Sequence, residues 1–211
     1  MVAVRIKSAV HAVRRDEILQ AAVKEIGRQG LMSLTMDDCA RAAGVAKGTL
    51  YLYFKDKDDL TASAIQSGLN RLKQELEIIA AREITVAERL RQMLVRQLEF
   101  FDANRQLYRV FLEEKGRMCG NPKDPVLKRL KKGRQGYVDF MIAVVSQGIE
   151  SGEFRNLSPA KLGMIWVEMV GGMAVHRLTS TSLDSPEEDA NFLLDLFLKG
   201  ASSSNGRKQK S

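Results

Sequence analysis

Apolar residues recur along most of this 211-residue chain at intervals of three and four, the spacing that places them on one face of an α-helix. No segment alternates with the period of two that marks a half-buried β-strand. Glycines, prolines and capping residues divide the pattern into about nine helices. The sequence therefore predicts an all-α fold, with helices at residues 14–29, 35–43, 46–54, 56–80, 85–104, 106–114, 126–151, 158–179 and 185–200.

The segment 33–60 has the most distinctive pattern, with two short helices separated by Gly44 and followed by a longer helix. Thr35 is a suitable N-cap for the first short helix. Leu50 and Phe54, one turn apart, give the second short helix a narrow apolar stripe, and polar groups occupy the rest of its surface. This layout is typical of a helix-turn-helix, whose second helix enters the major groove of DNA. The alternative is a helical corner with solvated polar residues.

The polar residues of the second short helix suit contacts with a duplex. Lys47 can reach a guanine edge or a phosphate, whereas Thr49 and Leu52 can touch thymine methyl groups. Glycine inside a helix costs about 1 kcal/mol relative to alanine, so Gly48 suggests a close approach of the DNA backbone. Hydrogen bonds to phosphates are expected from the following residues: Thr35, Tyr51, Tyr53, Lys55 and Lys57.

The same segment closely resembles the tetracycline-repressor (TetR/AcrR) family of transcription regulators over about residues 12–65. Three runs carry the resemblance: Thr35 to Asp38 (TMDD), Ala42 to Tyr51 (AAGVAKGTLY) and Tyr53 to Leu60 (YFKDKDDL). The resemblance implies a homodimer that reads a palindromic operator in double-stranded DNA and responds to a small-molecule effector. It also implies DNA contacts at Thr35, Ala46, Lys47, Thr49, Tyr51, Tyr53 and Lys57.

The chain is expected to contain four parts. Residues 1–13 are predicted to be a basic flexible arm, which either follows DNA phosphates or stays solvated. A helix-turn-helix domain is predicted at 14–56, a helical regulatory and dimerisation domain at 57–200, and a polar disordered tail at 201–211.

The dimer interface is predicted on the two last helices, because both are apolar nearly all round and such helices are buried on more than one side. The alternative is a core within one chain. The predicted interface residues are Ile165, Met169, Gly171, Gly172, Met173, Phe192, Leu196 and Phe197.

The effector site is predicted between helices of the regulatory part, as the family resemblance implies. Aromatic and methionine side chains at helical spacing are the candidates, with ordinary core packing as the alternative: Met93, Phe100, Phe101, Tyr108, Phe111, Met141 and Trp166. Residues 105–134 hold ten Lys or Arg against three acidic residues. The apolar candidates favour an apolar or amphipathic effector. The basic excess either attracts an anionic ligand or forms a solvated face, so an anionic effector is an alternative.

Composition and charge bear on the partner, the cellular location and the class of protein. The formal net charge of +7 favours polyanionic partners, and the two cysteines, Cys39 and Cys119, lack metal-binding spacing and suit a reducing cytosol. Glu168, His176 and Arg177 interrupt the most apolar helix, so no membrane span is expected, and we predict a cytoplasmic protein without cofactor or metal. No nucleophile motif or phosphate-binding loop indicates an enzyme. A non-specific nucleic-acid binder and, more remotely, an enzyme or carrier for an anionic ligand are the alternatives.

Overall fold

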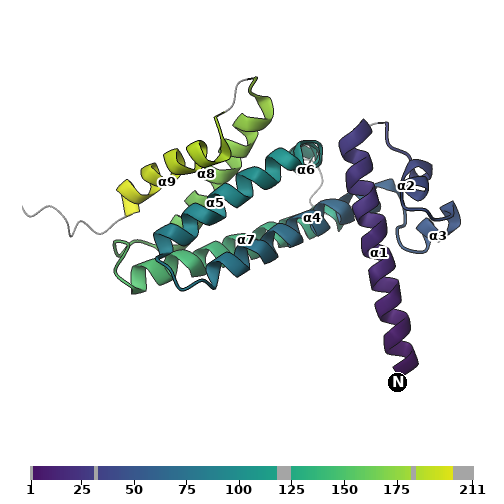
Figure 1. Ribbon diagram of the computed structural model, residues 1–211, viewed down its shortest axis with the longest axis horizontal. Helices are drawn as coiled ribbons and strands as arrows, with labels where there is room; N and C mark the ends of the chain where they lie inside the picture. Colours follow the sequence, from purple (N-terminus) through teal and green to yellow (C-terminus); the bar gives the residue numbers. More distant parts are fainter. Residues whose placement is uncertain (1, 31–32, 118–124, 182–183, 202–211) are drawn as a thin grey trace, which may run out of the picture. The chain divides into compact units, whose positions relative to one another are not determined.

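The computed structural model describes residues 2–30, 33–117, 125–181 and 184–201. These residues form helices joined by short connections, without a β-strand, as Figure 1 shows. The all-α prediction is therefore confirmed. The helices are α1 (Val2–Gln29), α2 (Met36–Ala42), α3 (Lys47–Tyr51), α4 (Lys57–Ala80), α5 (Val86–Ala103), α6 (Arg105–Arg117), α7 (Pro125–Glu150), α8 (Pro159–Thr179) and α9 (Pro186–Ala201).

Most helix ends lie at the residues that local chemistry favours. Gly30, Gly44 and Gly152 have φ values of +76°, +62° and +77°, the left-handed conformation that ends a helix and that glycine adopts without a steric penalty. Pro159 and Pro186 are the first residues of α8 and α9. Proline suits this position because its fixed φ fits the helix and its missing N–H would have had no partner there.

The start of α1 and the end of α3 differ from the predicted helix bounds. α1 begins at Val2 and not at Arg14, because residues 2–13 contain no glycine or proline that would stop the helix. The expected arm is therefore helical from its second residue. α3 is shorter than expected and ends at Tyr51. Residues 118–124, which lie between the predicted helices 106–114 and 126–151 and include Cys119, and residues 202–211 of the predicted tail lie outside the described residues.

The chain packs as two compact units. The N-terminal unit comprises Met1–Arg71 and Asn104–Lys132, and the second unit comprises Leu72–Ala103 and Gly133–Ser211. This division differs from a boundary after residue 56, because apolar residues of α4, α6 and α7 share one core with the first three helices. Those later residues are Leu60, Ala64, Ile65, Leu107, Val110 and Leu130.

The second unit is built around α5, which packs against α8 and α9. α7 and α8 approach closely at Gly163, where an added Cβ would lie 2.9 Å from the backbone nitrogen of Ile142. None of the helices in the described ranges is long and apolar enough to cross a membrane.

A buried arginine joins three helices of the second unit. The Arg177 side chain on α8 is 3% exposed, and its Nε donates to both carboxylate oxygens of Asp102 on α5 at 3.2 and 3.1 Å. Its Nη1 binds the carboxylate of Asp189 on α9 and the carbonyl oxygen of Asp184, the latter at 2.9 Å. The two carboxylates hold the pKa of the guanidinium above its ordinary value, so the arginine stays charged despite its burial.

Replacing this arginine is expected to destabilise the protein strongly. Arg177→Met leaves two partly buried carboxylates without their partner, and breaking such a pair costs about 3 kcal/mol or more. Arg134→Met is the matched control, because its pair with Glu168 is about half exposed and contributes at most about 1 kcal/mol. Urea unfolding of both variants measures the difference, and equal midpoints would contradict this account of Arg177.

Candidate nucleic-acid interface

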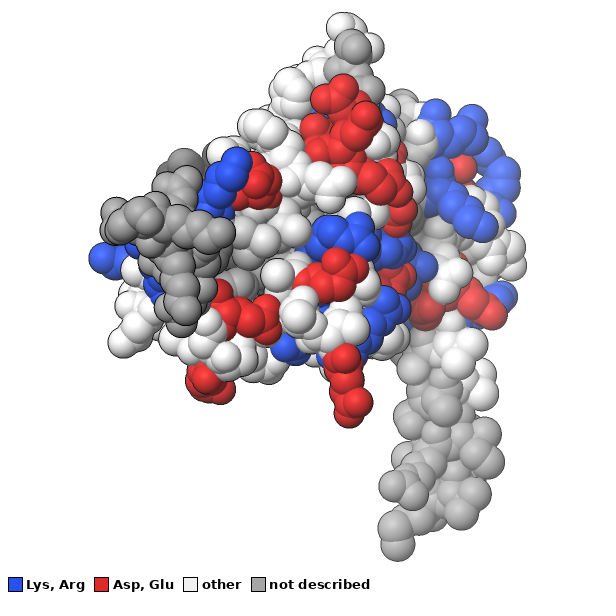
Figure 2. Space-filling view, turned by 60° about the vertical axis from the view of Figure 1, so that its left-hand side comes forward, with Lys and Arg blue, Asp and Glu red and all other residues white. Residues whose placement is uncertain are grey.

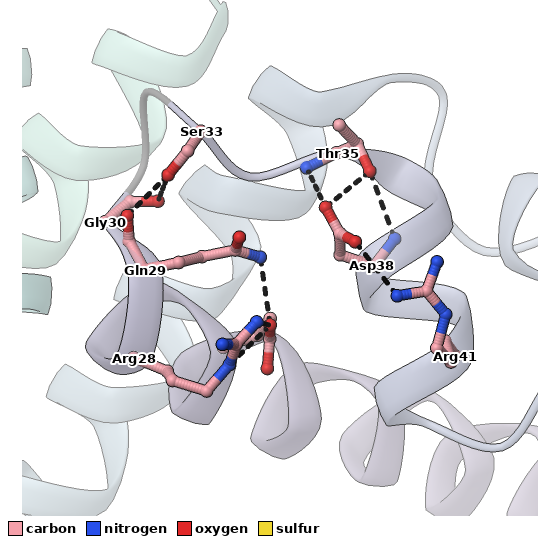
Figure 3. Close-up of polar contacts among 8 residues, drawn as sticks. Arg28, Gln29, Gly30, Ser33, Thr35, Asp38 and Arg41 are labelled. Atoms are coloured by element: carbon pink, nitrogen blue, oxygen red, sulfur yellow. Dashed lines mark hydrogen bonds and ion pairs between the residues drawn. The ribbon is translucent and has the colours of Figure 1, made fainter.

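The start of α2 is fixed by a reciprocal capping box, drawn in Figure 3. The backbone N–H of Asp38 donates to Thr35 Oγ1 at 3.1 Å, and the backbone N–H of Thr35 donates to Asp38 Oδ2 at 3.0 Å. The Thr35 hydroxyl also donates to Asp38 Oδ2 at 2.6 Å, and these hydrogen bonds lower the pKa of the Asp38 carboxyl. The Thr35 hydroxyl, which was expected to form a hydrogen bond with a DNA phosphate, therefore already donates its proton to Asp38.

The turn between α2 and α3 depends on Gly44. Its N–H donates to the carbonyl of Arg41 at 3.1 Å, and the N–H of Val45 donates to the carbonyl of Ala40 at 2.9 Å. Its φ of +62° reverses the chain immediately after α2. A side chain other than glycine would be strained here, so this residue sets the direction in which α3 leaves α2.

α3 is attached to the protein by one apolar side. Leu50 is fully buried and Phe54 is 1% exposed, as the apolar stripe predicted. The chain ends its regular helix at Tyr51, but Leu52 keeps helical angles and the N–H of Phe54 donates to the carbonyl of Leu50 at 3.1 Å. Phe54 therefore returns to the core one turn after Leu50, and the Arg15 guanidinium lies over its ring, 5.0 Å from the centroid.

The opposite side of α3 faces solvent. Tyr51 is 48% exposed and Leu52 is 77% exposed, although a tyrosine and a leucine gain stability by burial. An added Cβ at Gly48 would meet nothing within 4 Å, so packing inside the protein does not require a glycine at this position. Of the other predicted DNA contacts, Ala46, Lys47 and Lys55 are exposed, and Thr49, Tyr53 and Lys57 are half-buried. The structure therefore brings the predicted contacts of α3 together on one accessible face.

Two partners of this face were missed by the sequence analysis. Lys47 Nζ lies 2.9 Å from Asp37 Oδ2, and this carboxylate raises the pKa of the lysine. Contact between Lys47 and DNA therefore requires the ammonium to exchange Asp37 for a base or phosphate. The Tyr53 ring stacks on His11, with centroids 4.3 Å apart, so Tyr53 also packs against α1. No local pattern pairs residues this far apart in sequence.

Cys39 lies in the same unit and is fully buried. Burial is the main cause that raises the pKa of its thiol to about 11, and the nearby Asp38 and Glu25 carboxylates add to the rise. The thiolate is the reactive form of cysteine, so this residue is inert at neutral pH, as its place on the apolar face of α2 predicted.

The predicted effector residues lie in two different cores. Met93, Met141 and Trp166 are fully buried in the second unit, where Phe100 and Phe101 also lie. Tyr108 and Phe111 belong to the N-terminal unit, with ring centroids 5.8 Å apart, and Phe111 packs against its core. The seven candidates are thus divided between the two units, and their role in ligand binding stays a prediction. Gln97 and Tyr137, two polar residues of the second unit, were missed.

The predicted interface residues of α8 and α9 differ in exposure. Ile165, Phe192 and Leu196 are 51%, 60% and 53% exposed, which leaves large apolar side chains without cover in this chain. Gly172 is exposed, whereas Met169, Gly171 and Met173 are half-buried. Phe197 is buried instead, because its ring contacts the Trp166 ring edge-on at a centroid distance of 5.2 Å.

Comparison with known protein families gives two matches that cover most of the chain. The model of bacterial regulatory proteins, tetR family, matches residues 18–64, and the model of the tetracyclin repressor-like C-terminal domain matches residues 83–175. The fatty acid metabolism regulator protein of Bacillus subtilis is 24% identical over 188 residues, which are 87% of this chain and 93% of that protein. The HTH-type transcriptional repressor KstR2 of Mycobacterium tuberculosis is 28% identical over 143 residues, 67% of this chain and 70% of that protein.

Solved structures share the fold. FadR from Bacillus subtilis, in complex with stearoyl-CoA, has a TM-score of 0.73 at 22% identity, with 87% of this chain and 97% of that chain covered. KstR2 of Mycobacterium tuberculosis has a TM-score of 0.65 at 21% identity, with 90% and 96% covered.

Two substitutions separate the exposed side of α3 from its anchored side. Tyr51→Ala is expected to leave the unfolding midpoint nearly unchanged and to weaken binding to the preferred duplex at least tenfold, because the side chain projects into solvent. Leu50→Ala is expected to lower stability by about 2–5 kcal/mol, as for other buried leucines. Thermal unfolding and fluorescence anisotropy with labelled DNA test both; a collapse of stability in Tyr51→Ala would show that the two sides are assigned wrongly.

Proposed function

The chain belongs to the tetR family of bacterial regulatory proteins, and we propose that it is a homodimeric repressor released from a palindromic operator by a small molecule. Membership in this family makes it a DNA-binding transcriptional regulator and not an enzyme. The single observation that carries the proposal is the side of α3 that exposes Lys47, Tyr51 and Leu52 while Leu50 and Phe54 anchor the helix. A regulator that acts on bacterial DNA is expected in the cytoplasm.

The proposed dimer uses the exposed apolar side chains of α8 and α9. Ile165, Phe192 and Leu196 are each more than half exposed, and burial of such side chains favours association. A two-fold axis through this surface makes each contact between residues i and j occur twice, so the same patch is used by both subunits. The two α3 helices would then read half-sites about one duplex turn, roughly 34–36 Å, apart.

The proposed effector is apolar or amphipathic. Support comes from the structure of FadR with stearoyl-CoA, a ligand with a long apolar chain, and from the buried methionine and tryptophan side chains of the second unit. The ligand would bind more tightly to the conformation with low DNA affinity, and the equilibrium between the two conformations would shift. Linkage requires that DNA lower ligand affinity by the same factor.

Sequence-selective binding distinguishes a regulator from a non-specific nucleic-acid binder. Selection of duplexes from a random pool by the full-length protein is expected to enrich a palindrome whose two half-sites have centres about one helical turn apart. The enriched duplex should bind at least about a thousandfold more tightly than a shuffled duplex at the same salt concentration. A pool that stays random after several rounds, with equal affinity for all duplexes, would support the non-specific alternative.

The proposed interface can be tested by introducing a charge. Leu196→Asp is expected to convert the dimer into a monomer, because burial of an unpaired carboxylate in an apolar interface is strongly unfavourable. Ile78→Asp is the matched control, since Ile78 is 65% exposed on α4 and lies outside the proposed interface. Sedimentation equilibrium measures both masses. If Leu196→Asp stays dimeric, the interface lies elsewhere.

A further inference from the structure

Three polar side chains from three helices meet inside the second unit. Gln97 on α5 is 1% exposed, Trp166 on α8 is fully buried, and Tyr137 on α7 is half-buried. Gln97 Nε2 donates to the Tyr137 hydroxyl at 2.6 Å. Burial raises the pKa of Tyr137, and the Trp166 and Gln97 side chains, which lie within hydrogen-bonding reach of its hydroxyl, offset part of that rise.

Two atoms of this cluster have no hydrogen-bond partner among the described residues. They are Oε1 of Gln97, an acceptor, and Nε1 of Trp166, a donor that lies beside the Tyr137 hydroxyl but makes no well-directed hydrogen bond to it. Each such atom costs about 1–3 kcal/mol when it is buried and unpaired. The same unit pairs its buried Arg177 with two carboxylates. Arg89 Nε in this unit is also unpaired, but Nη1 of the same guanidinium donates to the carbonyl of Ala80 and to the Gln147 side chain. The unpaired atoms of Gln97 and Trp166 belong to one cluster and call for a specific explanation.

Buried apolar residues lie one helical turn from each member of the cluster. Met93 precedes Gln97 by one helical turn, Met141 follows Tyr137 by one turn, and Val170 follows Trp166 by one turn, all buried. The close contact of α7 and α8 at Gly163 holds Trp166 near α7. Methionine side chains adapt to ligands of irregular shape, so this region can rearrange around a guest more readily than a core of branched side chains.

We propose that Gln97 and Trp166 bind a neutral oxygen, a hydroxyl or a carbonyl, of an otherwise apolar effector; this inference rests on the function proposed above. The oxygen accepts a hydrogen bond from Trp166 Nε1. A hydroxyl also donates to Gln97 Oε1, whereas a carbonyl accepts from Nε2 when the Gln97 amide is reversed, with Tyr137 then donating to Oε1. A carboxylate fits poorly, because the cluster contains no cation to balance a buried charge.

Trp166 is the only tryptophan of the chain, so its fluorescence reports on this cluster directly. Titration of the DNA-free protein with 1-decanol or 2-decanone is expected to change the emission saturably. The apolar analogue 1-chlorodecane, of similar length, and decanoate at pH 8 are expected to bind at least tenfold more weakly. Equal affinity for all four probes, or binding of none, overturns the proposal and indicates a buried water or an unpaired core instead.

A double substitution separates ligand recognition from structural support. Gln97→Met with Tyr137→Phe removes the amide and the hydroxyl together, so it leaves no new unpaired atom. The melting temperature is expected to stay equal or rise, while the preference for 1-decanol over 1-chlorodecane falls by about tenfold. Gln135→Met, an exposed change on α7, is the control and should alter neither property. A preference that survives the double substitution overturns the proposal.

The probe titration and the duplex selection together distinguish failure of the oxygen-binding site from failure of the proposed regulatory function. Selective binding of the oxygen-bearing probes by a protein that enriches no palindrome would retain the ligand site and remove the proposed function. A protein that enriches a palindrome without any preference among the probes would retain the function and remove the oxygen site.

Discussion

The position of α3 depends on the burial of Leu50 and Phe54. A helix of five residues is not stable by itself, because helix nucleation is unfavourable and so short a segment forms few hydrogen bonds. The two side chains supply the missing stability by packing into the core of the N-terminal unit. The remaining residues of α3 are exposed or, at Thr49, half-buried, so they stay accessible for contact with DNA.

Electrostatics has a more local role than the net charge suggests. The chain has a formal charge of +7, yet the face drawn in Figure 2 carries basic side chains interspersed with acidic ones. On the DNA-binding face itself, Lys47 is paired with Asp37. A duplex must therefore compete with a carboxylate for the lysine. The net positive charge attracts any duplex, whereas the geometry of individual donors decides which DNA sequence is bound.

Local signals in the sequence predicted the helices well, because helix ends depend on a few adjacent residues. Gly44, Gly152 and Pro159 act within one turn, and the stripe of Leu50 and Phe54 follows from helical spacing alone. Pairings between distant segments were not predictable in this way. The contacts of Tyr53 with His11 and of Gln97 with Tyr137 each join residues about 40 apart. Aromatic residues at helical spacing also gave no indication of which core each would enter, and the seven effector candidates were divided between two.

The N-terminal core includes Leu107, Val110 and Leu130, although the family model for the DNA-binding region matches only residues 18–64. The N-terminal unit, which contains the DNA-binding helices, is thus not a continuous stretch of chain. A chimera that joins only the first seventy or so residues to another sensor would expose the apolar surface that these three side chains cover. A chimera that transfers the DNA-binding helices to another regulator must therefore include the residues of α6 and of the start of α7.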